Sequence, residues 1–206
     1  MKKTISQATI DRLPLYFRTL RLVEDEDIHI ISSDELGKRL GITPEQIRKD
    51  LATFGQFGRK GIGYDVHELK DRISNILGLQ NCWRLAIVGV GHLGGALANY
   101  VNFASLGFSV VALFDSNPTV VGTEVNGLIV ENISEMKRVI EAKEVDIGII
   151  TVPADEAQGV ADLLVAAGVK GIWNFAPTRL TVPQVPLVNE DLSIGLSALS
   201  YHMSQE

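Results

Sequence analysis

The spacing of apolar residues divides the chain into two regions with different periodicities. Up to about residue 80, apolar positions recur every three or four residues, as one buried helix face requires, beginning with Ile10, Leu13, Phe17 and Leu20. From Trp83 onward, short continuous apolar runs alternate with helical segments, which is typical of a parallel sheet covered on both faces. The pattern therefore predicts a small helical domain followed by a doubly wound α/β domain.

Capping and breaking residues predict the ends of the first two helices. The segment SQATIDRLPLYFRTLRLVE, residues 6–24, contains Pro14, which predicts either a helix start near Arg12 or a kink. A second, short helix is expected between Ser33 as its N-cap and Gly41 as its stop.

The third helix has a strong start signal. Thr43 stands at the cap, Pro44 at the first helical position, and Gln46 three residues after the cap, which is the spacing of a capping box. With the second helix and the tight turn before it, this helix forms a helix-turn-helix. The glycine-rich stretch GQFGRKGIGYDV then predicts a hairpin with its tip near Arg59–Gly61, which would be a wing, followed by a fourth helix that ends at Gly78.

Charge separates the two regions as clearly as periodicity does. Residues 1–80 carry 13 Lys and Arg against 12 Asp and Glu, whereas residues 81–206 carry 6 against 13, in a chain with a formal net charge of -6. The first region can approach a polyanion, and the second would be repelled by one. If the chain binds nucleic acid, it does so through its first region.

Basic residues gather where a helix-turn-helix meets DNA. Arg48 and Lys49 lie in the first turns of the third helix beside Gln46, where a recognition helix contacts base edges and phosphates. Arg59 and Lys60, at the glycine-rich tip, are placed to enter an adjacent minor groove. A solvated basic face is the alternative for four such charges, and their position on a helix-turn-helix favours double-stranded DNA.

The second region reads as strands and helices in alternation. The expected strands are residues 85–90, 110–115, 146–152 and 171–175, and the expected helices between them are residues 93–103, 134–143 and 155–167. The chain then ends in a helix whose apolar stripe is Leu192, Leu196, Leu199 and Met203. This stripe has no evident partner in its own sheet, so exchange into a second subunit would bury it.

A dinucleotide fingerprint follows the first of these strands. In RLAIVGVGHLGGALANY, Gly89, Gly91 and Gly94 have the G-x-G-x-x-G spacing between a strand and a helix, and Asp115 ends the next strand, where a carboxylate binds a ribose diol. The residues after Asp115 include no Lys or Arg to receive a 2′-phosphate, which favours NAD(H). The alternative is that the glycines serve only close packing of helix and strand.

Further cofactor contacts are expected in the loops that follow the strands. Ligands bind in open α/β sheets at the carboxyl ends of the strands, which gives a candidate set of Gly89, Val90, Gly91, His92, Leu93, Gly94, Asp115, Thr151, Val152, Pro153, Asn174, Phe175, Ala176 and Pro177. His92 is either a proton donor to phosphate or an exposed loop residue. The prolines either line the crevice or only terminate strands.

Visible catalytic chemistry is lacking beside this binding site. A dehydrogenase usually needs a proton donor beside the nicotinamide, and no His–Asp or Lys–Tyr arrangement stands at the strand ends, so the chain is not expected to be an enzyme. A small NAD-dependent oxidoreductase with an N-terminal assembly domain is the alternative.

A single cysteine, Cys82, excludes an internal disulfide and a cysteine-cluster metal site, and no metal site is expected. Without a secretory signal or a membrane-length apolar run, we expect a cytoplasmic protein.

Six phrases, in order, resemble one known family. They are ATIDRLPLYFR, RKDLATFGQFGRKGIGY, GVGHLGGALANY, FDSNP, TVPADEAQ and GIWNFAP, and the chain resembles the Rex redox-sensing transcriptional repressors throughout its length. The resemblance implies a homodimer with winged-helix N-terminal domains, Rossmann domains that bind NADH or NAD, and an exchanged C-terminal helix. It also implies a repressor that NADH releases from palindromic operator DNA.

The resemblance also implies the domain limits and a switch. Residues 1–80 would be the winged-helix domain, residues 81–188 the NAD(H)-binding Rossmann domain, and residues 189–206 the swapped dimerisation helix. Positions that couple ligand to domain orientation in the family match Arg18, Tyr100 and Asp191. The family often has an aromatic residue after that aspartate, whereas this chain has Leu192, a smaller wedge against the nicotinamide.

Overall fold

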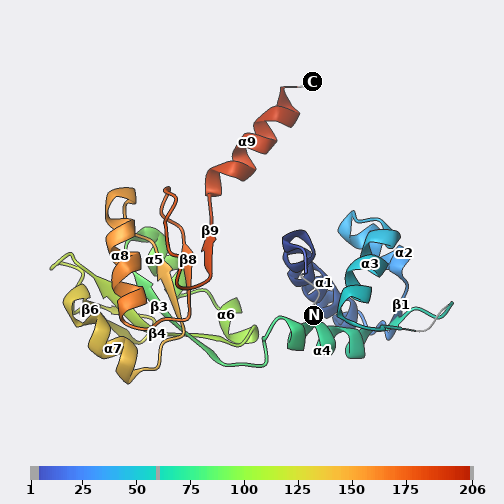
Figure 1. Cartoon of the computed structure of the whole chain (residues 1–206), viewed down its shortest axis with the longest axis horizontal. Helices are drawn as coiled ribbons and strands as arrows, with labels where there is room; N and C mark the ends of the chain where they lie inside the picture. The colour runs from blue at the N-terminus through green and yellow to red at the C-terminus, as the bar shows by residue number, and fades with distance from the viewer. Residues whose placement is uncertain (1–4, 59–60, 205–206) are drawn as a thin grey trace. The chain divides into compact units, whose positions relative to one another are not determined.

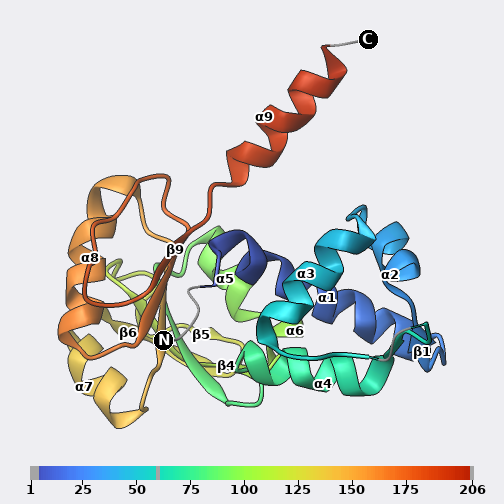
Figure 2. The ribbon, with the colours of Figure 1, turned by 45° about the vertical axis from the view of Figure 1, so that its right-hand side comes forward.

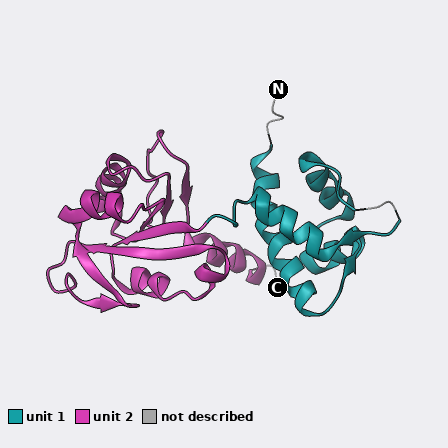
Figure 3. Cartoon of the chain, turned by 90° about the horizontal axis from the view of Figure 1, so that it is seen from below, with its two compact units in different colours: residues 1–81 teal, residues 82–206 magenta. Residues whose placement is uncertain are grey.

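The computed structural model describes residues 5–58 and 61–204 of the chain. These residues form two compact units, residues 1–81 and residues 82–206, which Figure 3 shows in different colours. The first unit is helical and the second contains a seven-stranded sheet. The α/β class predicted from the pattern is therefore confirmed.

The first unit begins with a helix that passes through a proline. Its elements are α1 Gln7–Asp25, β1 Ile30–Ile31, α2 Ser33–Leu40, α3 Pro44–Phe54, β2 Tyr64–Asp65 and α4 Val66–Ile76 (Figure 1). The helix α1 starts after Ser6, whose hydroxyl accepts a hydrogen bond from the backbone N–H of Thr9. The predicted start near Arg12 is wrong, because this cap and the buried face of α1 outweigh the one backbone hydrogen bond that Pro14 cannot donate.

The second helix is capped one residue earlier than predicted. The hydroxyl of Ser32 accepts a hydrogen bond from the backbone N–H of Glu35, so Ser32 is the N-cap and Ser33 is already helical. The hydroxyl of Ser33 is instead taken by Arg48 of α3, at 2.6 Å. The predicted stop is confirmed, since Gly41 has a left-handed φ of 67°.

The third helix has the predicted cap but only half of a capping box. Thr43 accepts from the backbone N–H of Gln46 at 3.3 Å, and Pro44 takes the first helical position. The Gln46 amide does not return to Thr43; it donates to the buried Asp50 at 2.8 Å. A buried carboxylate needs hydrogen bonds more than an exposed cap does, and this explains the difference.

The wing strand pairs with a segment that the pattern did not indicate. Tyr64 of β2 lies opposite Ile31 of β1 in an antiparallel pair. The hairpin predicted over GQFGRKGIGYDV is wrong, because Phe57, before its expected tip, lies outside any strand. Gly63 makes the observed pairing possible, since a Cβ there would lie 2.6 Å from the carbonyl oxygen of Ile31.

The second unit is built on a mainly parallel sheet. Its strands are β3 Trp83–Val88, β4 Phe108–Asp115, β5 Glu124–Val125, β6 Leu128–Asn132, β7 Ile147–Ile150, β8 Gly171–Asn174 and β9 Leu187–Asn189. They lie in the order β5-β6-β4-β3-β7-β8-β9, and all neighbours are parallel except β5 and β6. The predicted doubly wound sheet is confirmed, while β5, β6 and β9 are additions, because their short runs carry no distinct pattern.

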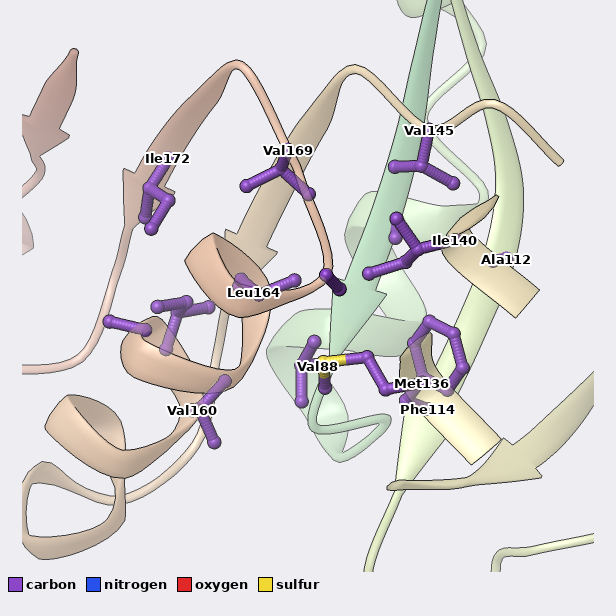
Figure 4. Close-up of a cluster of buried hydrophobic side chains, with 14 of the residues drawn as sticks. Val88, Ala112, Phe114, Met136, Ile140, Val145, Val160, Leu164, Val169 and Ile172 are labelled. Atoms are coloured by element: carbon purple, nitrogen blue, oxygen red, sulfur yellow. The ribbon is translucent and has the colours of Figure 1, made fainter. Parts of the chain in front are cut away.

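Helices cover both faces of the sheet (Figure 2). They are α5 His92–Ala98, α6 Asn102–Ser105, α7 Met136–Ala142 and α8 Ala154–Ala166, with a 3₁₀ turn Ile133–Glu135 before α7. On one face, buried side chains of α7 and α8 such as Met136 and Leu164 pack on Val88 and Phe114 (Figure 4). On the other face, Phe103 of α6 joins the cluster on β3 and β4. Burial on both faces explains the unbroken apolar strand runs.

The helix expected over residues 93–103 is broken in two. It ends at the C-cap Asn99, whose side-chain amide and backbone N–H both donate to the carbonyl of Gly95, at 2.8 and 3.3 Å. Tyr100 lies in the break before α6 and is half exposed. The break therefore places Tyr100 on a turn rather than on a helix face.

The last helix, α9 Leu192–Met203, has no buried residue. Asp191 caps it by accepting from the backbone N–H of Ser193 at 2.9 Å. The apolar side chains Leu192, Leu196, Leu199 and Met203 are between 54% and 70% exposed. Within the single chain, this apolar stripe is uncovered.

Candidate dinucleotide and nucleic-acid sites

The glycine loop between β3 and α5 has the geometry of a phosphate-binding turn. Gly89 has a φ of 94°, and a Cβ there would lie 2.9 Å from the carbonyl oxygen of Thr151. A Cβ at Gly94 would collide with the carbonyl oxygen of Gly89, whereas a Cβ at Gly91 would meet open space. Gly91 is also the N-cap of α5 and offers no side-chain acceptor to the first turn. The loop is thus packed on its protein side and open to a ligand at Gly91.

The carboxylate of Asp115 joins this loop to the next one. It accepts hydrogen bonds from the backbone N–H of Val90 at 2.7 Å and from that of Asn117 at 2.8 Å. A carboxylate has about four acceptor positions, so two remain for the hydroxyls of a ribose. Asp115 also lines a cavity of about 200 Å³ together with Gly89, Gly91 and the loop after β7. The structure therefore brings the predicted ribose carboxylate to the predicted phosphate loop.

The residues after β7 complete this cavity. Thr151, Val152 and Pro153 all line it, with Glu156 of α8 beside them. The hydroxyl of Thr151 lies 2.6 Å from the carbonyl oxygen of Gly89, to which it donates. Thr151 thus supports the glycine loop, while Val152 and Pro153 present apolar surface. Glu156 is a cavity residue that the sequence pattern did not single out.

The residues after β8 have different positions from one another. Asn174 is fully buried, and its amide group hydrogen-bonds the backbone of Ala176 and Thr178 and the side chain of Asn189. Its side chain therefore shapes the loop and does not face a ligand. Phe175 is half-buried and Pro177 is exposed at the surface of that loop. His92 is exposed at the start of α5, next to a half-buried Leu93.

An aromatic group beside the loop after β8 is not indicated by the sequence pattern. The ring of Trp173 contacts that of Phe175, with centroids 4.5 Å apart, and that of Phe103, with centroids 6.3 Å apart. Its indole N–H donates to the carboxylate of Glu190 at 3.2 Å. The alternation of Trp173 and Phe175 at the end of β8 is a usable signal in the sequence, but the contact with Glu190 is not, because Glu190 follows β9 and is 17 residues away.

The helix-turn-helix is held by a buried carboxylate. Asp50 of α3 is 1% exposed and receives hydrogen bonds from three residues of α1 and one of its own helix. Arg12 donates twice, at 2.6 and 2.8 Å, Tyr16 at 2.6 Å and Thr9 at 3.2 Å, and the fourth donor is Gln46. These contacts fix α3 against α1 and keep Gln46 from pointing freely into solvent.

The hydrogen bonds decide the charge of Asp50. Burial by itself would raise the pKa of this carboxyl, but the hydrogen bonds from Arg12, Tyr16 and Gln46 outweigh burial and lower its pKa to about 2. Burial, reinforced by the hydrogen bond to Asp50, raises the pKa of the Tyr16 hydroxyl. Asp50 is therefore ionised, and Arg12 is its counter-ion inside the unit.

The two basic residues of α3 differ in their surroundings. Arg48 is half exposed and donates to Ser33 at 2.6 Å and to Glu45 at 2.7 Å, which holds its guanidinium over the start of α2. Lys49 is exposed, and its ammonium makes no hydrogen bond or ion pair within residues 5–58 and 61–204. Arg48 is thus oriented in advance, whereas Lys49 is a mobile point charge.

A groove of about 570 Å³ lies beside Arg48. Its walls are α2, α3 and the segment that leads to β2, with Ser33, Leu51, Phe57 and Tyr64 among its lining residues. The predicted wing residues Arg59 and Lys60 lie outside the described residues. The groove therefore connects the helix-turn-helix to the wing segment on the side of α3 that carries Arg48.

The three predicted switch residues fall in both units. Arg18 is exposed on α1 in the first unit. In the second unit, the hydroxyl of Tyr100 accepts a hydrogen bond from Asn102 at 3.1 Å, and Asp191 caps α9. Hydrogen bonds from the hydroxyl and the backbone of Ser193 lower the pKa of Asp191. The three predicted switch residues therefore lie on α1, in the break between α5 and α6, and at the first end of α9.

Metal and membrane sites are not found in the described part of the chain. Residues 5–58 and 61–204 contain no group of three His, Cys, Asp or Glu side chains that could hold a metal ion. None of the helices formed by these residues is long and apolar enough to cross a membrane.

Two family models match the chain. Residues 4–52 match a family described as "Putative DNA-binding protein N-terminus", and residues 80–178 match the "CoA binding domain" family. The first match covers α1, α2 and most of α3, and the second covers the sheet from β3 to β8.

Relatives of known name match nearly the whole chain. The chain is 48% identical over 97% of its length to a "Redox-sensing transcriptional repressor Rex" of Syntrophobacter fumaroxidans, of which it covers 96%. It is equally identical to the protein of that name from Clostridium botulinum strain Hall, of which it covers 95%. Among solved structures, that of RSP in complex with β-NAD⁺ and operator DNA matches with a TM-score of 0.93 and 42% identity, over 98% of this chain and 94% of RSP. RSP in complex with β-NADH matches with a TM-score of 0.91 and 42% identity, over 98% of this chain and 96% of RSP.

Proposed function

The chain belongs to the Rex family of redox-sensing transcriptional repressors, and from this membership we propose which of its residues bind cofactor and DNA. It is a DNA-binding repressor that responds to NADH and NAD, and it is not an enzyme. The observation that carries this conclusion is the 48% identity to named repressors over 97% of the chain. The alternative of a small oxidoreductase is not favoured, because the relatives that match the whole chain are repressors.

The cofactor is assigned to the carboxyl ends of the parallel strands. The pyrophosphate lies over Gly91, where the loop is open, and the ribose hydroxyls bind the free acceptor positions of Asp115. Val152 and Pro153 cover the cofactor from the loop after β7. Phe175, Ala176 and Pro177 form the nicotinamide end, and the remaining assigned residues, Gly89, Val90, His92, Leu93, Gly94, Thr151 and Asn174, shape or border the loops.

Operator DNA is assigned to the first unit. Arg48, held over α2 by Ser33 and Glu45, is the base-reading residue of α3. Lys49 neutralises phosphate, and Gln46 has one amide hydrogen and its carbonyl oxygen left for the duplex after bonding Asp50. Arg59 and Lys60 are assigned to the wing. These roles support a division into residues 1–80 for DNA, residues 81–188 for cofactor and residues 189–206 for dimerisation.

The repressor acts as a homodimer on palindromic DNA. The exposed stripe of α9 supports this assembly, because exchange of α9 into a second copy would cover its apolar side chains. Arg18, Tyr100 and Asp191 then couple the bound cofactor to the orientation of the DNA-binding units. Since a bacterial repressor works where the chromosome is, the protein is placed in the cytoplasm.

Operator release measured against the NADH/NAD ratio tests this function. A palindromic operator duplex is bound at fixed salt, and the NADH fraction is raised at constant total cofactor. The expected result is a falling operator affinity, with no change for binding to a scrambled duplex, since phosphate contacts alone do not sense the cofactor. Equal operator affinity in NADH and in NAD would contradict redox sensing.

A further inference from the structure

Trp173 lies where three parts of the second unit meet. Its ring contacts the rings of Phe175 and Phe103, with centroids 4.5 and 6.3 Å apart. Its indole N–H donates to Glu190 at 3.2 Å, and Glu190 is half-buried. The indole is therefore both a packing element and a hydrogen-bond donor.

Each neighbour of Trp173 leads toward a residue with an assigned role. Phe175 is one of the residues assigned to the nicotinamide end of the cofactor site. The ring of Phe103 lies edge-on to that of Tyr100, with centroids 5.1 Å apart. Glu190 directly precedes Asp191, the N-cap of α9. Trp173 therefore contacts three residues, and each of them is next to a different region: the cofactor site, the break between α5 and α6, and the base of α9.

The segment before α9 is joined to the end of β8 by further bonds. The backbone N–H of Glu190 donates to the carbonyl of Asn174 at 2.8 Å, and the Asn174 amide donates to the side chain of Asn189 at 3.0 Å. The same amide group also holds the backbone of Ala176 and Thr178. A displacement of the loop after β8 would break buried hydrogen bonds unless the segment before α9 moves with it.

A cavity separates the two segments on the solvent side. Its volume is about 300 Å³, and it is lined by residues 176–179 from the loop after β8 and residues 189–191 from the base of α9. A cofactor group that binds beside the loop after β8 is therefore next to residues 189–191, which connect the sheet to α9. The joint between them is formed by the bonds from Trp173 and Asn174.

We propose that Trp173 is a positioning residue that, through its hydrogen bond to Glu190, couples the cofactor state in the crevice to the direction in which α9 leaves the sheet. The proposal rests on the proposed function, because it assumes that NADH and NAD bind at the carboxyl ends of β7 and β8. The indole then has two separate roles: its ring packs in the core, and its N–H links the cofactor site to α9 through Glu190.

Substitutions that remove only the hydrogen bond test the proposal. Trp173→Phe keeps an aromatic ring but has no donor, Glu190→Ala removes the acceptor, and Glu190→Gln keeps an acceptor oxygen. Trp83→Phe is the matched control, because Trp83 is the other tryptophan of the chain and begins β3. Three quantities are measured on the full chain: operator affinity without cofactor, NADH affinity, and the NADH concentration for half-release of operator.

The expected result is a change in the third quantity alone. Operator affinity and NADH affinity stay as in the wild type, while Trp173→Phe and Glu190→Ala each raise the NADH concentration for half-release about tenfold, within the usual range of coupling between sites. Their combination raises it no further, since both remove the same bond. Glu190→Gln and Trp83→Phe behave as the wild type.

Two results would overturn the proposal. One is an unchanged half-release concentration in Trp173→Phe and Glu190→Ala. The other is a rise that only follows a loss of NADH affinity, which would assign these residues to the shape of the crevice. If NADH fails to release the wild type, the proposed function falls first, and the proposal falls with it.

Discussion

The guanidinium of Arg12 on α1 contacts the carboxylate of Asp50 on α3 at 2.6 Å, inside the first unit. The Asp50 side chain is 1% exposed, and that of Arg12 is 24% exposed. The helix that carries the proposed DNA-reading residues is therefore fixed to α1 by an ion pair whose acidic member has no access to water. Its removal or protonation has measurable consequences.

Arg12→Ala is expected to destabilise the first unit. The substitution leaves the charge of Asp50 buried without its counter-ion, which costs about 3 kcal/mol of unfolding free energy. Both tryptophans lie in the second unit, so loss of helical circular dichroism at constant tryptophan fluorescence follows the first unit during urea unfolding. Arg39→Ala, which breaks exposed ion pairs with Glu26 and Glu35, is the control and should shift this transition much less.

Acid should weaken the first unit through Asp50. Its pKa is lowered in the folded chain from 3.8 to about 2, so the contribution of Asp50 is fully present above pH 4 and is lost as the pH falls from about 4 to about 2. Thermal unfolding of the full chain, followed at a series of pH values, should show this loss in the wild type. In Asp50→Asn the loss over that interval should be smaller by roughly 2 kcal/mol; identical pH profiles would contradict the low pKa.

Gly94→Ala is expected to abolish tight NADH binding. The added Cβ collides with the carbonyl oxygen of Gly89, so α5 must move away from β3 and the glycine loop must open. Overpacking of this kind costs about 1–3 kcal/mol, which corresponds to roughly ten- to hundredfold in NADH affinity measured by calorimetric titration. Gly95→Ala is the matched control, because a Cβ at the neighbouring position meets no atom within 4 Å. Unchanged NADH affinity in Gly94→Ala would show that the loop does not hold the cofactor.

Arg48 and Lys49 should contribute differently to DNA binding. Arg48→Ala is expected to cost about 1–3 kcal/mol on the operator and to relax sequence preference. Lys49→Ala should weaken operator and scrambled DNA alike and lower the slope of log K against log salt by about 1. Lys137→Ala on the exposed surface of α7 serves as the control for loss of one positive charge. The assignment of α3 to DNA fails if neither α3 variant loses affinity.

The stripe on α9 should hold two copies together. The paired substitution Leu196→Glu and Leu199→Glu places charges where apolar burial is expected and should yield single chains of 22.4 kDa in light-scattering chromatography. Ser197→Glu with Ser200→Glu introduces the same two charges on the neighbouring side of α9 and should remain dimeric at the same protein concentration. A dimer in both variants would argue against α9 as the dimerisation element.

Local chemistry explains what could be predicted from the sequence. Thr43 and Pro44 specify a helix start within four residues, Gly41 specifies a stop, and the glycine spacing after β3 specifies a tight turn. Such signals act through backbone groups close in sequence, so they survive in any tertiary context. The alternation of apolar runs and helices likewise predicted the doubly wound sheet, because both faces of its strands are buried.

The errors share one cause, which is competition from other hydrogen-bond partners in the folded chain. Ser33 is not the cap of α2 because Arg48 takes its hydroxyl, and Gln46 does not complete the capping box because Asp50 takes its amide. The wing strand pairs with Ile31 rather than with its nearest neighbours in sequence. Arg48 and Ile31 belong to other elements than their partners, whereas Asp50 lies on the same helix as Gln46 and takes its amide because Asp50 is buried against α1.

The sequence by itself determined the start of α3 and the stop of α2, the alternation of strands and helices in a doubly wound sheet, the glycine loop with its carboxylate, and the concentration of basic residues in the first unit. Only the tertiary structure decided the surroundings of Asp50, whose partners on α1 lie 34 to 41 residues away, and the contact of Trp173 on β8 with Glu190, which follows β9. The physical reason is that a buried polar group must be satisfied by whichever donors the folded chain brings to it, and these are chosen by packing rather than by spacing along the sequence.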